Sequence, residues 1–258
     1  MIGVYRELEG SMRLAAHVLR RFWVLKLPPV AEELARQIYF TGARATTTIV
    51  ILGALIGTLI IAYVIEVLNA DAELAVKILS WVVLREIGPL IAAVMVIQRS
   101  GTAVATELAL MKISGEVASL RHMRVDPHDY LVVPRVVGIA VANMALTVYV
   151  QFIAVGGGMV LSALIVNVSF GEMAGSFFLL ASPLDLVYSI AKSLLFGAAI
   201  GVIACYYGLN PPGTSINAVP KAAISAVTQA TLAVMLLNIV FAYLVYGSAL
   251  FGLFTADL

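Results

Sequence analysis

Long uncharged apolar runs recur along the chain, and short segments between them carry nearly all of the charge. A helix needs about 20 apolar residues to cross the hydrocarbon core of a bilayer, so each run of that length predicts one span. The first span is expected at Ala45–Ile65 and the second at Ile78–Gln98, where we interpret Arg85-Glu86 as buried charges within the membrane. The remaining spans are expected at Val136 to about Val155, at Leu186–Tyr207 and at Ala222 to about Phe251.

Two apolar segments differ from an ordinary span in length. Val136–Gly171 is uncharged for 36 residues and contains Gly156-Gly157-Gly158, so we expect a glycine-loosened periplasmic extension after the third span. Met173–Leu184 is too short to cross and is expected to lie at the membrane interface. The pattern therefore predicts an all-α polytopic membrane protein with five transmembrane helices.

The segment before the first span has its own pattern. Between Ser11 and Lys26, basic side chains recur at helical spacing and apolar ones cluster towards the opposite side, which is typical of a helix in the membrane interface. A cytosolic helix packed on a partner is the alternative. Pro28-Pro29 ends the helix, and we divide the chain into an N-terminal interfacial or cytoplasmic segment, 1–44, and a transmembrane domain, 45–258. The basic residues are Arg13, His17, Arg20 and Arg21, and the apolar ones are Met12, Ala15, Leu19, Phe22 and Trp23.

Composition and charge agree with a membrane protein and give it an orientation. With 62% apolar residues, 12% charged residues and a mean hydropathy of +1.02, the chain has too few polar side chains to cover a soluble globule. Of the 16 Lys and Arg residues, 13 lie in residues 1–45, in residues 99–135 or at Lys221. Cytoplasmic loops carry such an excess, so the N-terminus is expected inside and, after five crossings, the C-terminus outside.

The longest basic connection, Arg99–Arg135, is expected on the cytoplasmic side and contains a helix-like amphipathic stretch, Glu107–Met123. Gly101, Ala105 and Ala109 recur every four residues, a spacing that lets two helices approach closely in a membrane. Two alternatives remain for this stripe: packing within the chain, or a seam between two copies.

The sequence lacks the motifs of several kinds of chemistry. No Gly-x-x-x-x-Gly-Lys-Ser/Thr loop is present to cradle ATP phosphates. No group of His, Cys and carboxylates has metal-ligand spacing, and no serine lies in a nucleophile elbow. We therefore expect no catalysis by this chain, no cofactor or metal of its own, and no nucleic-acid partner.

Several motifs follow one another in order and together carry a resemblance. They are Leu84–Pro89 (LREIGP), Arg99–Ala103 (RSGTA), Glu107–Ser114 (ELALMKIS), Val125–Pro127 (VDP), Leu131–Arg135 (LVVPR) and Lys192–Gly197 (KSLLFG). From about Arg36 to its end, the chain resembles the MlaE/YrbE permease family, the membrane subunits of ABC transporters that work with MCE proteins. The chain departs from the family pattern at Gln98, where a glycine is usual, and at Pro220 and Ala223-Ile224.

The resemblance implies a function and a set of partners. A homodimeric permease in the cell inner membrane would move phospholipid or a related lipid to or from a periplasmic MCE protein, supporting outer-membrane lipid homeostasis and asymmetry. A separate ABC ATPase subunit would bind ATP and Mg²⁺, and an accessory cytoplasmic subunit is left open. A coupling helix near 107–128, centred on Gly115–Asp126, would dock on the ATPase. Its contact residues would be Glu116, Arg121, Met123, Asp126 and Pro127.

The resemblance also points to charges on the substrate path. Glu107 and Lys192 match family positions with functionally important charges, and Arg85, Glu86 and Arg99 belong to the same set. Lys192 lies about seven residues into its span, where an ammonium needs a carboxylate, a lipid phosphate or a wet cavity. The alternative function is an ion-coupled carrier or channel in which Arg85, Glu86, Glu107 and Lys192 form a charge relay. The sequence shows neither inverted repeats nor paired broken helices, which counts against it.

Overall fold

The computed structural model of the chain describes residues 2–21, 23, 28–42, 46–67, 72–165, 169–180 and 183–255, and these residues form helices without strands. The fold class is therefore all-α, as predicted. Four π-helical turns, η3 (Tyr63–Val67), η4 (Val83–Ile87), η5 (Ile97–Gly101) and η6 (His128–Val132), precede or link the helices. The helices are α1 (Ile2–Arg20), α2 (Pro28–Gly42), α3 (Thr46–Ala62), α4 (Ala72–Val82), α5 (Gly88–Val96), α6 (Thr102–Ile113), α7 (Glu116–His122), α8 (Val133–Ile165), α9 (Phe170–Leu180), α10 (Pro183–Leu209) and α11 (Ala218–Thr255).

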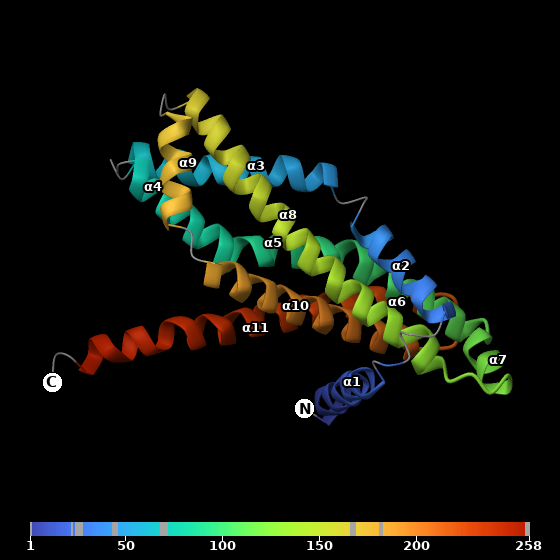
Figure 1. Cartoon of the computed structure of the whole chain (residues 1–258). Helices are drawn as coiled ribbons and strands as arrows, with labels where there is room; N and C mark the ends of the chain where they lie inside the picture. The colour runs from blue at the N-terminus through green and yellow to red at the C-terminus, as the bar shows by residue number, and fades with distance from the viewer. Residues whose placement is uncertain are drawn as a thin grey trace.

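Five stretches of the described helices are long and apolar enough to cross a membrane, which confirms the predicted number. Helix α8 crosses the bundle diagonally and packs on α3, α10 and α2 (Figure 1). Helices α2, α6 and α7 gather at one end of the molecule, which we call the basic end, and α4 and α9 lie at the other (Figure 1). The five stretches are Ile49–Glu66, Leu74–Ile113, His128–Leu164, Pro183–Leu209 and Ala218–Leu244.

The helix that contains the second span is longer than the sequence pattern predicted. Helix continues from Leu74 to Ile113 through η4 and η5, so Arg99 and Glu107 lie on the same continuous helix as the second span. Their position relative to the membrane stays a prediction. The amphipathic stretch Glu107–Met123 is not one helix either, because Gly115 takes a φ of +81° and separates α6 from α7. Only glycine adopts that backbone conformation without strain, so the glycine sets the boundary.

The glycine run in α8 does not loosen the chain, contrary to the expected extension. Helix α8 continues for 33 residues through it. A Cβ built on Gly158 would lie 2.7 Å from the carbonyl carbon of Gly57 on α3, and one built on Gly57 would overlap the main chain of Ala154. The missing side chains allow α3 and α8 to cross in close contact, which is how small residues stabilise helix pairs in membranes.

The small-residue stripe of the second span packs within the chain. Ala105 and Ala109 have no exposed surface, and Gly101 is buried. The Ala105 main-chain oxygen lies 3.0 Å from the Cβ position of Gly208 on α10, while Ala109 packs with Ala222 on α11. The seam between two copies is therefore the wrong alternative for these three residues, because their surface is already covered.

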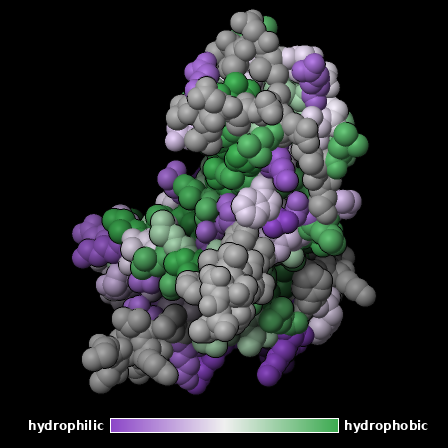
Figure 2. All heavy atoms as spheres, turned by 90° about the vertical axis from the view of Figure 1, so that its left-hand side faces the viewer, coloured by the Kyte–Doolittle hydropathy of each residue, from purple (hydrophilic) through white to green (hydrophobic). Residues whose placement is uncertain are grey.

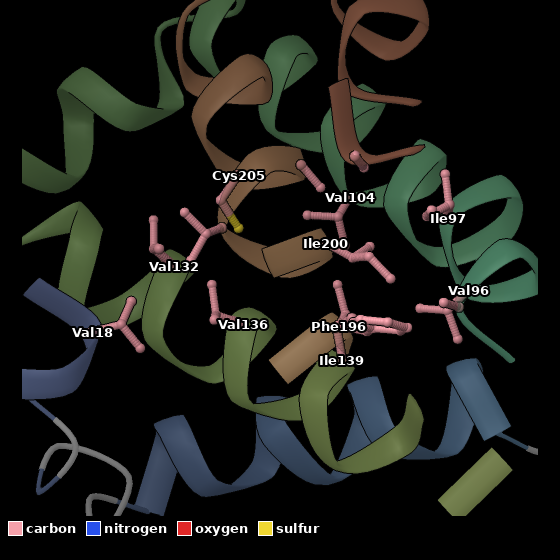
Figure 3. Packing of buried hydrophobic residues seen from close by; sticks show 14 of the residues in the cluster. Val18, Val96, Ile97, Val104, Val132, Val136, Ile139, Phe196, Ile200 and Cys205 are labelled. Carbon is pink, nitrogen blue, oxygen red and sulfur yellow. The ribbon is translucent and has the colours of Figure 1, made fainter. Parts of the chain in front are cut away.

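The main hydrophobic core lies towards the basic end, where helices from distant parts of the sequence meet. Figure 3 shows Val18 of α1, Val136 of α8, and Phe196 and Ile200 of α10 directed into one cluster. Large apolar side chains are also exposed on the outside, for example Leu59 and Phe152, and hydrophobic patches are visible on the face shown in Figure 2. Such a surface suits contact with lipid tails.

The N-terminal helix has a protein-facing side as well as the expected outer side. Leu14 and Val18 are buried in the main core, so one face of α1 packs on the rest of the chain. Met12 and Leu19, from the predicted apolar face, are 71% and 79% exposed, as a lipid-facing side requires. Phe22 lies outside the described residues. Contact of α1 with the membrane stays a prediction, as does the interfacial position of the 11-residue helix α9.

Candidate functional site

Lys192 lies at the centre of the candidate site. The side chain belongs to α10 and has no exposed surface. Its Nζ donates to Glu86 Oε2 at 2.8 Å and to the main-chain oxygen of Arg85 at 2.9 Å. The rings of Tyr188 and Phe196, one turn before and one turn after, have their centroids 5.7 and 5.9 Å from Nζ, within reach of cation–π attraction. Of the three partners that the sequence suggested for this ammonium, the carboxylate is present.

Pro89 explains why the Arg85 carbonyl is available to a side chain. In an α-helix the oxygen of residue 85 accepts from the N–H of residue 89, but proline has no N–H. A buried carbonyl without a donor costs about 1–3 kcal/mol. Lys192 supplies a donor, so a residue that normally disrupts a helix creates part of a binding site for a buried cation.

The wide turn η4 provides a second acceptor nearby. The N–H of Gly88 donates to the oxygen of Val83, one residue further back than in an α-helix, which leaves the Leu84 oxygen without its usual donor. Gln151 of α8 donates to that oxygen at 3.0 Å and also contacts Ser189 of α10. Helices α8 and α10 are thus both attached to the same irregular turn of the second span.

Arg85 and Glu86 pair with α10 and not with each other. Arg85 Nε donates to Asp185 Oδ1 at 2.8 Å, and the Arg85 guanidinium lies 5.3 Å from the ring centroid of Trp81. Asp185 lies in the first turn of α10, and Lys192 follows two turns later. The four side chains form a neutral network of two cations and two carboxylates, which we call the central network. Arg85 and Glu86 keep about a quarter of their side-chain surface, so they are less buried than predicted.

A second charged cluster lies between α8, α6 and α2 at the basic end. Arg135 is only 3% exposed and donates through Nη2 to Glu107 Oε1 at 3.0 Å. The same Nη2 lies 3.6 Å from Glu33 Oε1, and Nη1 donates to the Leu131 main-chain oxygen at 3.2 Å. Arg99 and Glu107 both line a pocket of about 330 Å³ beside this cluster. Within one chain, Glu107 and Lys192 therefore belong to different clusters.

A short helix, α7, lies where the coupling helix is predicted, and its coupling role stays a prediction. Helix α7 follows Gly115, buries Val117 and leaves Arg121 and Met123 exposed, the latter by 63%. Glu116 is exposed and accepts from Ser114 Oγ at 3.0 Å. Asp126 is also exposed, so four of the five predicted contact residues lie on an accessible surface at the basic end.

The end of the coupling segment is held by its own hydrogen bonds. Asp126 Oδ1 accepts from the His128 main-chain N–H at 2.9 Å and contacts the His128 ring at 3.3 Å. Partial burial raises the pKa of Asp126, but the main-chain bond and the charges of the two nearby histidines outweigh it, so the pKa is lowered below its ordinary 3.8. Pro127 is buried and precedes η6, so its position is structural.

One group of possible metal ligands was not detectable from sequence spacing. His17, Asp126 and Asp129 have ligand atoms within 4.8 Å of one another, although they come from α1, a loop and η6. His17 Nε2 lies 2.8 Å from Asp129 Oδ1, and Arg21 Nη1 lies 3.7 Å from the other oxygen of Asp129. These two side chains already accompany Asp129, and the contacts attach α1 to the segment that follows α7.

Sequence reasoning missed three residues that complete the clusters: Asp185, Arg135 and Gln151. In the sequence, Asp185 stands between the apolar segments Met173–Leu184 and Leu186–Tyr207, and Arg135 ends the predicted connection. Gln151 lies in the middle of an apolar run. A polar side chain in the middle of a span is costly unless it is bonded, and that signal could have identified Gln151.

Comparisons with known proteins agree with this architecture. The family model described as permease MlaE matches residues 34–244. A probable ABC transporter permease protein of Synechocystis is 31% identical over 169 residues, which cover 66% of this chain and 64% of the relative. One of Rickettsia conorii is 26% identical over 219 residues and covers 83% of both chains.

A third relative comes from a plant. The chloroplastic protein named TRIGALACTOSYLDIACYLGLYCEROL 1 of Arabidopsis thaliana is 31% identical over 156 residues, which cover 60% of this chain and 44% of the relative. The match to the family model covers most of the chain, including all five candidate spans in full. The chain therefore belongs to the MlaE family of ABC transporter permeases.

Proposed function

We propose that this permease moves phospholipid or a related lipid between the cell inner membrane and a periplasmic MCE-domain protein, driven by a separate ATPase that binds ATP and Mg²⁺. Family membership supports the transporter class. Support for a lipid comes from the plant relative, which is named after a glycerolipid. The N-terminus would lie in the cytoplasm and the C-terminus in the periplasm, as the distribution of basic residues favours.

The observation that carries the proposed mechanism is the central network. Lys192 is a fully buried cation in a membrane span, and such residues mark substrate paths more often than packing positions. Its Nζ is bound to one carboxylate oxygen and one carbonyl, both of which a lipid phosphate could replace as acceptors. A phosphate in the place of Glu86 would keep Lys192 paired and would leave Glu86, which retains 26% of its side-chain surface, to be hydrated.

The permease itself would perform no covalent chemistry. Its contribution would be to offer polar partners at a depth where lipid headgroups have none, which lowers the cost of moving a headgroup through the membrane. Energy would enter from the ATPase through α7. A second copy of the chain is proposed from the family resemblance, and its contact would use a surface other than the covered stripe at Gly101, Ala105 and Ala109.

Lipid transfer by the reconstituted complex tests this function. The chain, its ATPase and its MCE protein would be placed in vesicles with a fluorescent phospholipid, and ATP-dependent exchange with the MCE protein would be followed. Lys192→Ala should abolish transfer while the complex assembles and hydrolyses ATP, whereas Lys192→Arg should keep part of it. Wild-type transfer by an assembled Lys192→Ala/Glu107→Ala variant would show that these charges are not on the path. ATP-independent proton or cation flux would favour an ion-coupled carrier instead.

The coupling role of α7 has a separate test. Arg121 and Met123 provide a charge and an exposed apolar anchor, the combination that dominates many transient interfaces. Arg121→Glu combined with Met123→Ala should release the ATPase in pull-down experiments. Full retention of the ATPase with normal stimulation of its activity would exclude α7 as the docking element.

A further inference from the structure

The pocket at the basic end has a chemical character that the central network does not explain. It lies between α2 and the second span, where η5 meets α6, and has a volume of about 330 Å³. Its lining combines charged and polar residues of both helices with the apolar Phe40, Ala103 and Val104. The pocket is therefore amphipathic.

The charges of the pocket leave two arginines available. Its carboxylates, Glu33 and Glu107, are both directed at Arg135, which is buried behind them. Arg36 and Arg99 line the pocket and make no ion pair with any carboxylate of the described residues. Counting Arg135, the site holds three cations and two anions and is attractive to an anion.

Neutral donors lie beside the two arginines. Thr41 is 1% exposed, and its Oγ1 accepts from Ser100 Oγ at 2.9 Å and from Gln37 Nε2 at 3.3 Å. With both lone pairs of the oxygen engaged, the Thr41 hydroxyl has only its proton left to offer. Arginine guanidinium groups and hydroxyl donors in one pocket are the usual partners of a phosphate.

We propose that this pocket binds the phosphate of a membrane phospholipid at the basic end of the bundle, with Arg36 and Arg99 as the cationic contacts. This deepens the proposed function, on which it rests, by naming the headgroup chemistry at a second site. Phe40 is 43% exposed at the pocket and its neighbour Tyr39 is 68% exposed, so apolar surface is at hand for the glycerol and acyl portions. A soluble phosphate would use the same arginines but would gain nothing from the apolar residues.

Native mass spectrometry of the detergent-purified full chain with added dioleoylphosphatidylglycerol provides the test. Arg36→Gln/Arg99→Gln should weaken retention of the lipid at least tenfold, since two charge-assisted contacts are lost. The matched control is Arg124→Gln/Lys221→Gln, which removes the same charge from exposed positions outside the pocket and should retain the lipid as the wild type does. Equal retention by the pocket variant and the wild type would overturn the proposal.

Two further arms identify the source of the phosphate. Dioleoylglycerol, which lacks the phosphate, should bind far more weakly, and equal binding would rule out phosphate recognition. Inorganic phosphate in excess should not displace the lipid, and displacement would show a site for a soluble anion. Arg99→Lys keeps the charge and should retain part of the binding, which guards against a folding defect in the double variant. Because no ATP is present, failed transfer with intact retention would count against the proposed function and not against this site.

Discussion

The pairing of Lys192 with Glu86 makes a quantitative prediction about stability. Glu86→Gln leaves Lys192 fully buried with no carboxylate, and Lys192→Met leaves Glu86 without its cation. The other oxygen of Glu86 is buried and accepts no hydrogen bond from the described residues, so it offers no compensation. We therefore expect both single variants to be destabilised.

The expected size follows from the cost of an unpaired buried charge. Removing one partner of such a pair costs about 3–5 kcal/mol, while replacing both by neutral residues of similar volume is often nearly neutral. Glu86 keeps 26% of its side-chain surface, so Lys192→Met should fall at the low end of this range. For a chain of this size, about 3 kcal/mol corresponds to a thermal midpoint lowered by roughly 10 °C. Lys192→Met/Glu86→Gln should be more stable than either single variant.

Thermal unfolding of the purified chain in detergent measures all four corners of this double-mutant cycle. Single-variant losses that add up in the double variant would refute the reasoning, because additive losses mean that the two charges are not coupled. The double variant also separates structure from function. It should recover stability without recovering lipid transfer. Recovery of both would show that the Lys192–Glu86 pair serves the structure and not the transport.

Three further predictions concern the helices that position the site. Pro89→Ala should supply the missing N–H to the Arg85 carbonyl and draw that carbonyl away from the Lys192 ammonium. Lipid transfer should then fall while the thermal midpoint does not, and a fall in both would count against this account. Gly57→Ala should cost about 2–3 kcal/mol by forcing α3 away from the main chain of α8, whereas the control Gly156→Ala, whose Cβ meets no atom within 4 Å, should be neutral in the same unfolding assay. The lowered pKa of Asp126 contributes stability that is present above pH 3.8 and is lost as the pH falls through the folded-state pKa. Asp126→Asn should therefore weaken the loss of unfolding free energy at acidic pH, and an unchanged acid dependence would contradict this role of Asp126.

The spans could be predicted from the sequence because length and apolarity are the direct requirements of a bilayer. The pattern also showed that Lys192 needs a partner, since an isolated ammonium is too costly inside a span. The identity of the partner could not be predicted. Glu86 was visible in the sequence as a charge. Which residues of two helices face each other depends on how the helices are rotated, and an uncharged apolar run carries little information about that rotation.

Glycines were the least predictable feature. The run at Gly156 to Gly158 was interpreted as a loosened extension because glycine lowers helix propensity. In the structure, close approach to Gly57 outweighs that preference, as tertiary packing does for small residues in membranes. Gly115 behaves in the opposite way and ends a helix that hydropathy would have continued. The difference lies in the backbone, since Gly115 takes a φ of +81° while Gly156 to Gly158 stay helical.

Both candidate sites lie at wide turns of the same helix. The second span contains η4, where the Leu84 and Arg85 carbonyls receive side-chain donors, and η5, where Arg99 and Ser100 line the pocket. A π-helical turn contains one more residue than an α-helical turn, so it exposes main-chain acceptors and redirects side chains without ending the helix. The second span therefore carries polar groups at two depths and stays continuous up to the residues that precede α7. A movement of α7 caused by an ATPase would displace the residues of the pocket before those of the central network. A headgroup that enters from the basic end would meet the two sites in the same order.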